Sequence, residues 1–230
     1  LILYSSESLP ILTLNYSSNL NKLRKKMYQF GLLPEDEAIC IAEKSIIDGN
    51  NNASLIYPKN SWGKRIAESF SLRYEELGGK IIDEVIYDKD INKINDSVKN
   101  LLKIHESIKR KNKIQNLLNV KLQYKPYIPS DLNTIFAVGT STDMRLIKPQ
   151  FNFNFAENIP FYSTSHIYSG VPDKENNKDL NDIKFCDIPW LYNMKNLLEK
   201  NTFLENLERK ELLRFVALGM DSIKIIHNIE

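Results

Sequence analysis

The sequence has few cysteines and few glycines, and it lacks the short motifs that mark many enzymes. Cys40 and Cys186 lie far apart and form no CxxC pair, so neither a zinc site nor a redox motif is indicated. Only 8 glycines occur in 230 residues, and no GxGxxG or GxxxxGK[ST] loop follows an expected strand. HExxH and GxSxG are also absent. The signatures of nucleotide-binding enzymes, metalloproteases and α/β-hydrolases are therefore missing.

A large charge of one sign and a long apolar run are missing as well. The formal net charge is +2, which gives no global indication of a nucleic acid or a membrane as partner. Neither a signal peptide nor a membrane-spanning run is recognisable. The chain opens on LILYSSESLPILTLNY without a methionine, so we expect it to be a piece of a longer or processed protein.

The elements that are present alternate between strands and helices. Apolar runs predict strands at 10–16, 52–58, 80–87, 133–139, 159–165 and 183–190. Amphipathic stretches predict helices at 31–49, 61–79, 94–104, 141–157, 191–200 and 205–227. This alternation is typical of an α/β fold with parallel sheets and right-handed βαβ connections. A three-layer arrangement is expected over 31–182.

Three local predictions follow from individual residues. Pro34 and the acidic residues after it should start a helix, and Ser61 should be the N-cap of the next. Cys40 falls in an expected helix and Cys186 in an expected strand. A bridge between them needs Cα atoms within about 7 Å, so we predict that they are not bonded.

Hydroxyl and aromatic side chains gather where the expected strands end. In an open parallel sheet, ligands bind beyond the carboxyl ends of the strands. These side chains are therefore candidates for a ligand or partner cleft, although Ser and Thr also belong at helix caps and turns on any fold. The candidates are Asn15, Tyr16, Tyr57, Ser61, Trp62, Ser141, Thr142, Ser165, His166 and Tyr168.

The stretch FYSTSHIYSG, residues 161–170, contains a serine next to a histidine. Adjacent residues of an extended strand point to opposite faces. Ser165 and His166 are therefore not expected to form a catalytic dyad, and a hydrogen-bonded structural or cleft histidine is the better interpretation.

Residues 105–131 form an insertion too long for a simple loop, with a helix of its own. Residues 99–125 contain eight Lys or Arg and one Glu, and Lys109, Arg110, Lys111 and Lys113 form a basic surface. It could dock an acidic partner or an envelope polymer. The favoured interpretation is the solvated face of a helix that buries Ile104, Ile108, Ile114, Leu117 and Leu118, because isolated charge runs usually face water. It lacks the interleaved aromatics of a platform for single-stranded nucleic acid.

Several long segments resemble one known family. They include GLLPEDEA (31–38), LIYPKNSWGKRIAESF (55–70), TIFAVGTSTDMRLIKPQFNFNFA (134–156), IPFYSTSHIYSG (159–170), IKFCDIPW (183–190) and ALGMDS (217–222). These segments resemble the C-terminal domain of the LppC/LpoA outer-membrane lipoproteins. The resemblance spans nearly the whole chain.

The resemblance implies a fold similar to type I periplasmic binding proteins, with two Rossmann-like lobes and parallel sheets. Residues 31–182 would form the second lobe, residues 1–30 part of the first, and residues 183–230 a crossing strand and the return to the first. The first lobe is expected to be incomplete in this chain.

The resemblance also implies a role. Proteins of this family are lipid-anchored on the periplasmic side of the outer membrane and activate a class A penicillin-binding protein, the peptidoglycan synthase, without being enzymes. No cofactor, no metal and no nucleic acid is expected, and the anchor would lie outside this chain.

A small-molecule receptor that closes on a polar ligand, such as an amino acid or a cell-wall fragment, stays open as the alternative. An amino-acid receptor needs a carboxylate and a cation as anchors, and only Asp143 and Arg145 offer them near the strand ends. For a protein partner, the cleft rim is slightly preferred over the basic insertion at 105–125, because exposed aromatics contribute strongly at interfaces. This aromatic rim comprises Tyr57, Trp62, Ser141, His166 and Tyr168.

Overall fold

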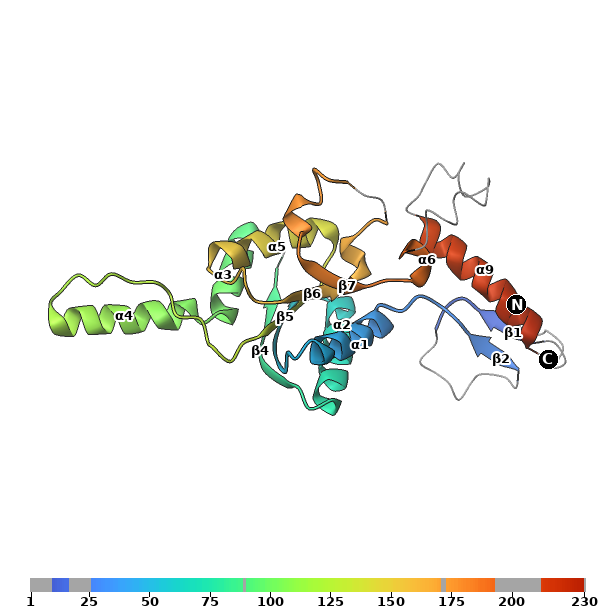
Figure 1. Cartoon of the computed structure of the whole chain (residues 1–230), viewed down its shortest axis with the longest axis horizontal. Helices are drawn as coiled ribbons and strands as arrows, with labels where there is room; N and C mark the ends of the chain where they lie inside the picture. Colours follow the sequence, from blue (N-terminus) through green and yellow to red (C-terminus); the bar gives the residue numbers. More distant parts are fainter. Residues whose placement is uncertain (1–9, 17–25, 89, 171–172, 193–211, 230) are drawn as a thin grey trace. The chain divides into compact units, whose positions relative to one another are not determined.

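The computed structural model describes residues 10–16, 26–88, 90–170, 173–192 and 212–229. These residues divide into two compact units. One comprises the described parts of 1–33 and 188–230, and the other is Pro34–Asp187. Figure 1 shows the elements along the chain.

The unit Pro34–Asp187 is built on a five-stranded parallel sheet with the order β4-β3-β5-β6-β7. The strands are β3 (Asn52–Pro58), β4 (Lys80–Tyr87), β5 (Thr134–Ala137), β6 (Phe161–Thr164) and β7 (Ile183–Cys186). All five predicted strands of this unit are present and parallel, so the fold class is confirmed. β7 is an edge strand of this sheet. The expected boundary between 31–182 and 183–230 lies at its first residue, Ile183.

Helices cover both faces of this sheet. The covering helices are α1 (Pro34–Ile47), α2 (Ser61–Glu76), α3 (Ile91–Leu101) and α5 (Ser141–Phe153). The helix α4 (Ile104–Leu118) follows α3 and projects from the unit. On one face, buried side chains of α1 and α2 pack with Leu55 and Phe136. On the other, those of α3 and α5 pack with Ile56 and Ile135. Alternate residues of each central strand therefore enter opposite cores, which produces the predicted three layers.

Local signals explain most helix boundaries. Pro34 opens α1 with three acidic residues in its first turn, where they complement the helix dipole. Gly49 follows the helix with a φ of +83°, a conformation that glycine adopts without steric cost. The predicted N-cap of α2 was wrong by one residue. The cap is Asn60, whose side chain accepts a 2.7 Å hydrogen bond from the Gly63 amide.

The other unit contains a two-stranded parallel sheet, β1 (Ile11–Thr13) with β2 (Met27–Gln29), and the helices α6 (Pro189–Tyr192) and α9 (Leu213–Asn228). Trp190 fastens α6 to α9, because its indole N–H donates to Asp221 at 3.2 Å and Lys224 lies over its ring. β2 was not predicted. Most of the predicted helix 191–200, and the start of that at 205–227, fall outside the described residues.

Candidate functional site

The carboxyl-end edge of the five-stranded sheet brings together most of the predicted cleft residues. Tyr57 is the next-to-last residue of β3. Ser61 and Trp62 begin α2, and Ser141 and Thr142 begin α5. Ser165 and His166 lie in the short 3-10 helix η3 (Ser165–Ile167) that follows β6, with Tyr168 next along the chain. Asn15 and Tyr16 follow β1 and belong to the other unit.

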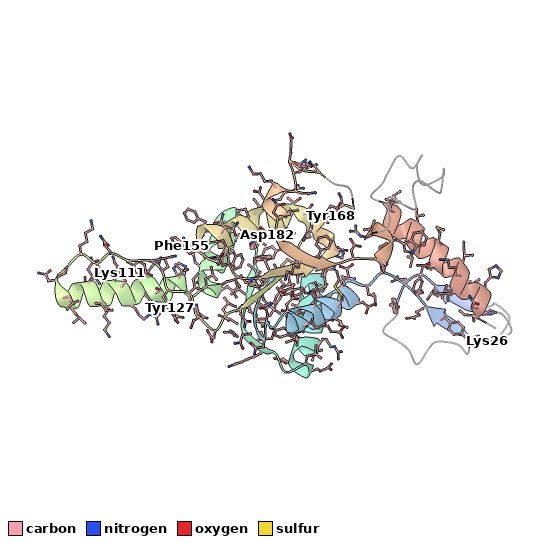
Figure 2. The ribbon with its side chains drawn as sticks, viewed as in Figure 1. Lys26, Lys111, Tyr127, Phe155, Tyr168 and Asp182 are labelled. Atoms are coloured by element: carbon pink, nitrogen blue, oxygen red, sulfur yellow. A yellow bond between two sulfur atoms is a disulfide. The ribbon has the colours of Figure 1, made fainter. Side chains whose placement is uncertain are left out.

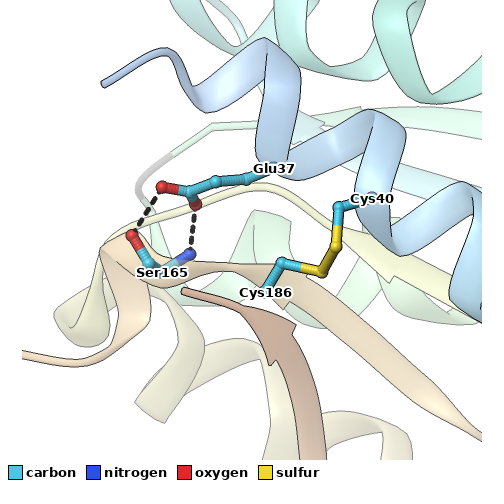
Figure 3. The surroundings of a disulfide bond; sticks show 4 residues. All are labelled: Glu37, Cys40, Ser165 and Cys186. Carbon is cyan, nitrogen blue, oxygen red and sulfur yellow. Dashed lines mark hydrogen bonds between the residues drawn. A yellow bond between two sulfur atoms is a disulfide. The ribbon is translucent and has the colours of Figure 1, made fainter. Parts of the chain in front are cut away.

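Ser165 is buried and bound to Glu37, which is not among the predicted cleft residues. Its backbone N–H and its hydroxyl donate to the two carboxylate oxygens of Glu37, at 2.6 and 2.8 Å, as Figure 3 shows. Glu37 lies in the first turn of α1, 128 residues away along the chain. The Ser165 hydroxyl thus ties η3 to α1, and its proton is directed at a carboxylate rather than at the neighbouring histidine.

The prediction for the two cysteines was wrong. Cys40 of α1 and Cys186 at the end of β7 form a disulfide, with Cα atoms 6.4 Å apart (Figure 3). The reason is the packing of α1 across β6 and β7, which brings two residues 146 positions apart within bridging distance. The Glu37 contact and the disulfide lie within one turn of α1, so this helix is fixed once to η3 and once to β7.

His166 is exposed and lies beside Trp62. The two ring centroids are 5.2 Å apart in an edge-on arrangement, and the His166 Nδ1 lies 3.2 Å from the Thr164 hydroxyl. Trp62 is half-buried against the α1–α2 core. Next to it, the Gly63 backbone lies so close to Pro58 that a Cβ at Gly63 would come within 2.6 Å of the proline ring. The Trp62–His166 pair is the aromatic feature that the edge presents to solvent.

Tyr57 was expected to be an exposed residue of the aromatic rim, but it is buried. It is only 6% exposed and packs in the core beside α1 and α2, and burial raises the pKa of its hydroxyl. Tyr168 is half-buried, with its ring 5.7 Å from that of Phe185. Of the predicted aromatic residues along this edge, Tyr57 is therefore not available for contact with a partner, and Trp62 and His166 remain as the main candidates.

The start of α5 is occupied by its own cap. Thr140 and Asp143 form a reciprocal capping box, in which the Thr140 N–H and hydroxyl donate to the Asp143 carboxylate at 3.0 and 2.9 Å. Asp143 is 6% exposed. Arg145, the other predicted anchor, has a buried Nε without a hydrogen-bond partner among the described residues. The acid of the predicted anchor pair thus accepts hydrogen bonds from the start of its own helix.

The basic surface lies on α4, away from this edge. In Figure 1, α4 extends from the sheet as an arm, and the chain then returns along it. Lys109, Arg110 and Lys113 are exposed, and Lys111 is half-exposed. A groove of about 390 Å³ lies between the helix and the returning chain. Among the described residues, no group of three His, Cys, Asp or Glu side chains could hold a metal ion.

The parallel sheet between two helical layers defines the class. This is an α/β fold of the type I periplasmic-binding-protein kind. It is similar to the crystal structure of full-length LpoA from Haemophilus influenzae, with a TM-score of 0.64 and 21% identity over 94% of this chain and 35% of that one. It is also similar to a "putative branched-chain amino acid ABC transporter" from Chromobacterium violaceum, with a TM-score of 0.53 and 17% identity over 79% of this chain and 48% of that one.

The chain belongs to the LppC family, whose model, described as "LppC putative lipoprotein", matches residues 3–230. A curated relative from Vibrio antiquarius, "Penicillin-binding protein activator LpoA", is 28% identical over 95% of this chain. The chain spans about a third of that relative's length, 36%. In the part of the chain that the structure describes, no helix is long and apolar enough to cross a membrane.

Proposed function

We propose that this protein is a non-catalytic regulator of peptidoglycan synthesis, which activates a class A penicillin-binding protein by direct contact. The observation that carries the proposal is membership of the LppC family over residues 3–230, with a relative called a penicillin-binding protein activator aligned along 95% of the chain. The domain would act within a longer parent protein, without a cofactor and without a nucleic-acid partner.

Activation by contact requires only that the regulator bind the active state of the synthase more tightly than the inactive state. The polar groups at the sheet edge fit a structural role in such a regulator. Ser165 donates to Glu37, Asn60 caps α2, and Thr140 and Asp143 cap α5. These groups hold the fold together, and the contact surface is left to side chains that face solvent.

The location that we propose is the periplasmic side of the outer membrane, reached through a lipid anchor elsewhere in the parent protein. Membership of a family described as lipoproteins supports the proposal that the parent protein carries a lipid anchor. The Cys40–Cys186 disulfide supports an oxidising compartment such as the periplasm, because disulfides persist there and are rare in the cytosol.

A receptor for a small polar ligand is the less favoured function. An amino-acid ligand would need a free carboxylate to hold its ammonium group, and the carboxylate of Asp143 accepts hydrogen bonds from the start of its own helix. The likeness to a transporter protein is at 17% identity and concerns the fold.

The experiment is a pull-down with the full-length parent protein on detergent-solubilised membranes, in which retained penicillin-binding proteins are visualised with a fluorescent penicillin. We expect enrichment of a class A enzyme over monofunctional penicillin-binding proteins. The control bait is the parent protein lacking this domain. Equal recovery of the class A enzyme on both baits, or none on either, would count against a role for this domain.

A further inference from the structure

The arm formed by α4 and the returning chain exposes apolar side chains that a helix packed against a core would normally bury. Of the residues of α4, only Ile104 and Ser107 are buried. The prediction that its other apolar side chains are covered is wrong. Leu117 is 75% exposed, and three further apolar residues of the arm are about half exposed, namely Ile114, Leu118 and Val120. Apolar side chains clustered on one projecting surface often mark a contact with another molecule.

A shaped groove accompanies these apolar residues. Residues 121–129 form neither helix nor strand, and two hydrogen bonds to the Ser107 hydroxyl oxygen hold them near α4. The Tyr124 hydroxyl donates at 2.6 Å and the Tyr127 amide at 2.8 Å. The hollow left between the two segments is lined by Ser107, Arg110, Lys111, Ile114, Leu122, Gln123, Tyr124 and Tyr127. Figure 2 labels Lys111 and Tyr127 on the two segments.

The charge of the arm is not neutralised within the unit. None of Lys109, Arg110, Lys111 and Lys113 forms an ion pair with a described residue. Between residues 99 and 125, the sequence offers one acid, Glu106. The Arg110 guanidinium lies over the Tyr127 ring at 5.8 Å, which orients a cation beside the groove. A positive surface of this kind attracts and orients acidic partners.

We propose that this groove docks an acidic segment of the synthase, with a carboxylate of that segment at Arg110 and Lys111 and an apolar side chain against Ile114 and Leu122. The inference rests on the proposed function, which supplies the partner. A protein segment fits better than a lipid surface or a nucleic acid, because the hollow is concave and is lined by tyrosine and arginine, residue types enriched in protein interfaces.

The test measures binding of the full-length parent protein to a purified class A penicillin-binding protein at low and at physiological salt. One variant changes Lys109, Arg110, Lys111 and Lys113 to Ser, and another carries Ile114→Ser with Tyr127→Ala. A control removes the same charge from exposed lysines elsewhere on the unit, at Lys64, Lys80, Lys174 and Lys178. Circular dichroism and thermal unfolding verify that each variant folds.

We expect each arm variant to bind the synthase roughly tenfold more weakly or worse, while the control changes affinity by less than about twofold. The variant without the four arm cations should also lose much of the salt dependence, because screened charge attraction is what salt weakens.

Normal binding by both folded arm variants, with wild-type protein binding as well, overturns the arm as the docking surface and leaves the proposed function intact. Absence of binding by the wild-type protein overturns the proposed function itself. Wild-type binding to anionic vesicles or single-stranded DNA that both arm variants lose, with their synthase affinity unchanged, would assign the arm to a lipid surface or a nucleic acid instead.

Discussion

Removing the Cys40–Cys186 disulfide should strongly destabilise the unit Pro34–Asp187. The bond closes a loop of 146 residues, and in the chain-entropy description a loop of this length restricts the unfolded chain by about 5 kcal/mol at 25 °C. Cys40 is exposed and Cys186 is half-buried, so replacing both by serine buries no unpaired hydroxyl at Cys40. We therefore expect the double variant to lose up to about 5 kcal/mol of unfolding free energy.

The assay is denaturant and thermal unfolding of oxidised wild-type protein, reduced wild-type protein and the Cys40→Ser, Cys186→Ser double variant. Since domains of this size shift by roughly 2–4 °C per kcal/mol, the melting temperature should fall by up to roughly 10–20 °C, and equally in the reduced and double-variant proteins. Unreduced wild-type protein should weigh two hydrogens less than reduced protein. Two free thiols without reductant, or identical unfolding of oxidised and double-variant proteins, would refute this reasoning.

Three further substitutions test contacts around the sheet. Trp62→Ala should cost about 2 kcal/mol of stability, because the half-buried ring packs on the core and on His166; an unchanged melting temperature would show that the ring contributes nothing to folding. Glu37→Ala should cost about 2 kcal/mol by leaving the buried Ser165 N–H without its acceptor, and hydrogen exchange at that amide should accelerate. Asp48 accepts hydrogen bonds from Lys184, Lys44 and Tyr162, and these bonds lower the pKa of its carboxyl group, with Lys184 having the largest effect. Its stabilisation is therefore present above about pH 4 and is lost as pH falls. Asp48→Asn should destabilise the protein by about 1 kcal/mol at pH 7 and by less at pH 3, and an equal effect at both values would contradict the ion pairing.

Local patterns in the sequence predict most of the five-stranded unit. Apolar runs mark its strands because a parallel sheet covered on both faces buries nearly every residue of its central strands. Pro34 and Gly49 mark the ends of α1 because each fixes a backbone conformation locally. β2 escapes this reasoning, since three residues are too few to show a period.

The contacts that join distant segments could not be predicted in this way. The disulfide and the Glu37–Ser165 hydrogen bonds connect positions 146 and 128 residues apart, and their partners depend on which helix lies over which strand. The acidic first turn of α1 is a signal for a helix start alone. It does not indicate that one of its carboxylates binds a serine after β6.

For the arm, the sequence predicts the helix but wrongly predicts that its apolar face is buried. Its extra length predicts an insertion with a helix, and α4 confirms it. The apolar spacing of Ile114, Leu117 and Leu118 is typical of a buried helix face, but burial requires a neighbouring element to cover that face. Beyond Ser107, no side chain of α4 is buried. This exposure is why we consider the helix a candidate contact surface.

The decisive measurement is the rate of glycan polymerisation by a purified class A penicillin-binding protein. We expect the full-length parent protein to raise this rate in a saturable manner. We expect no increase from the parent lacking this domain, and no turnover of a peptidoglycan precursor by the parent alone. An unchanged rate with well-folded, full-length protein, or equal stimulation by the parent without this domain, would contradict the proposed function.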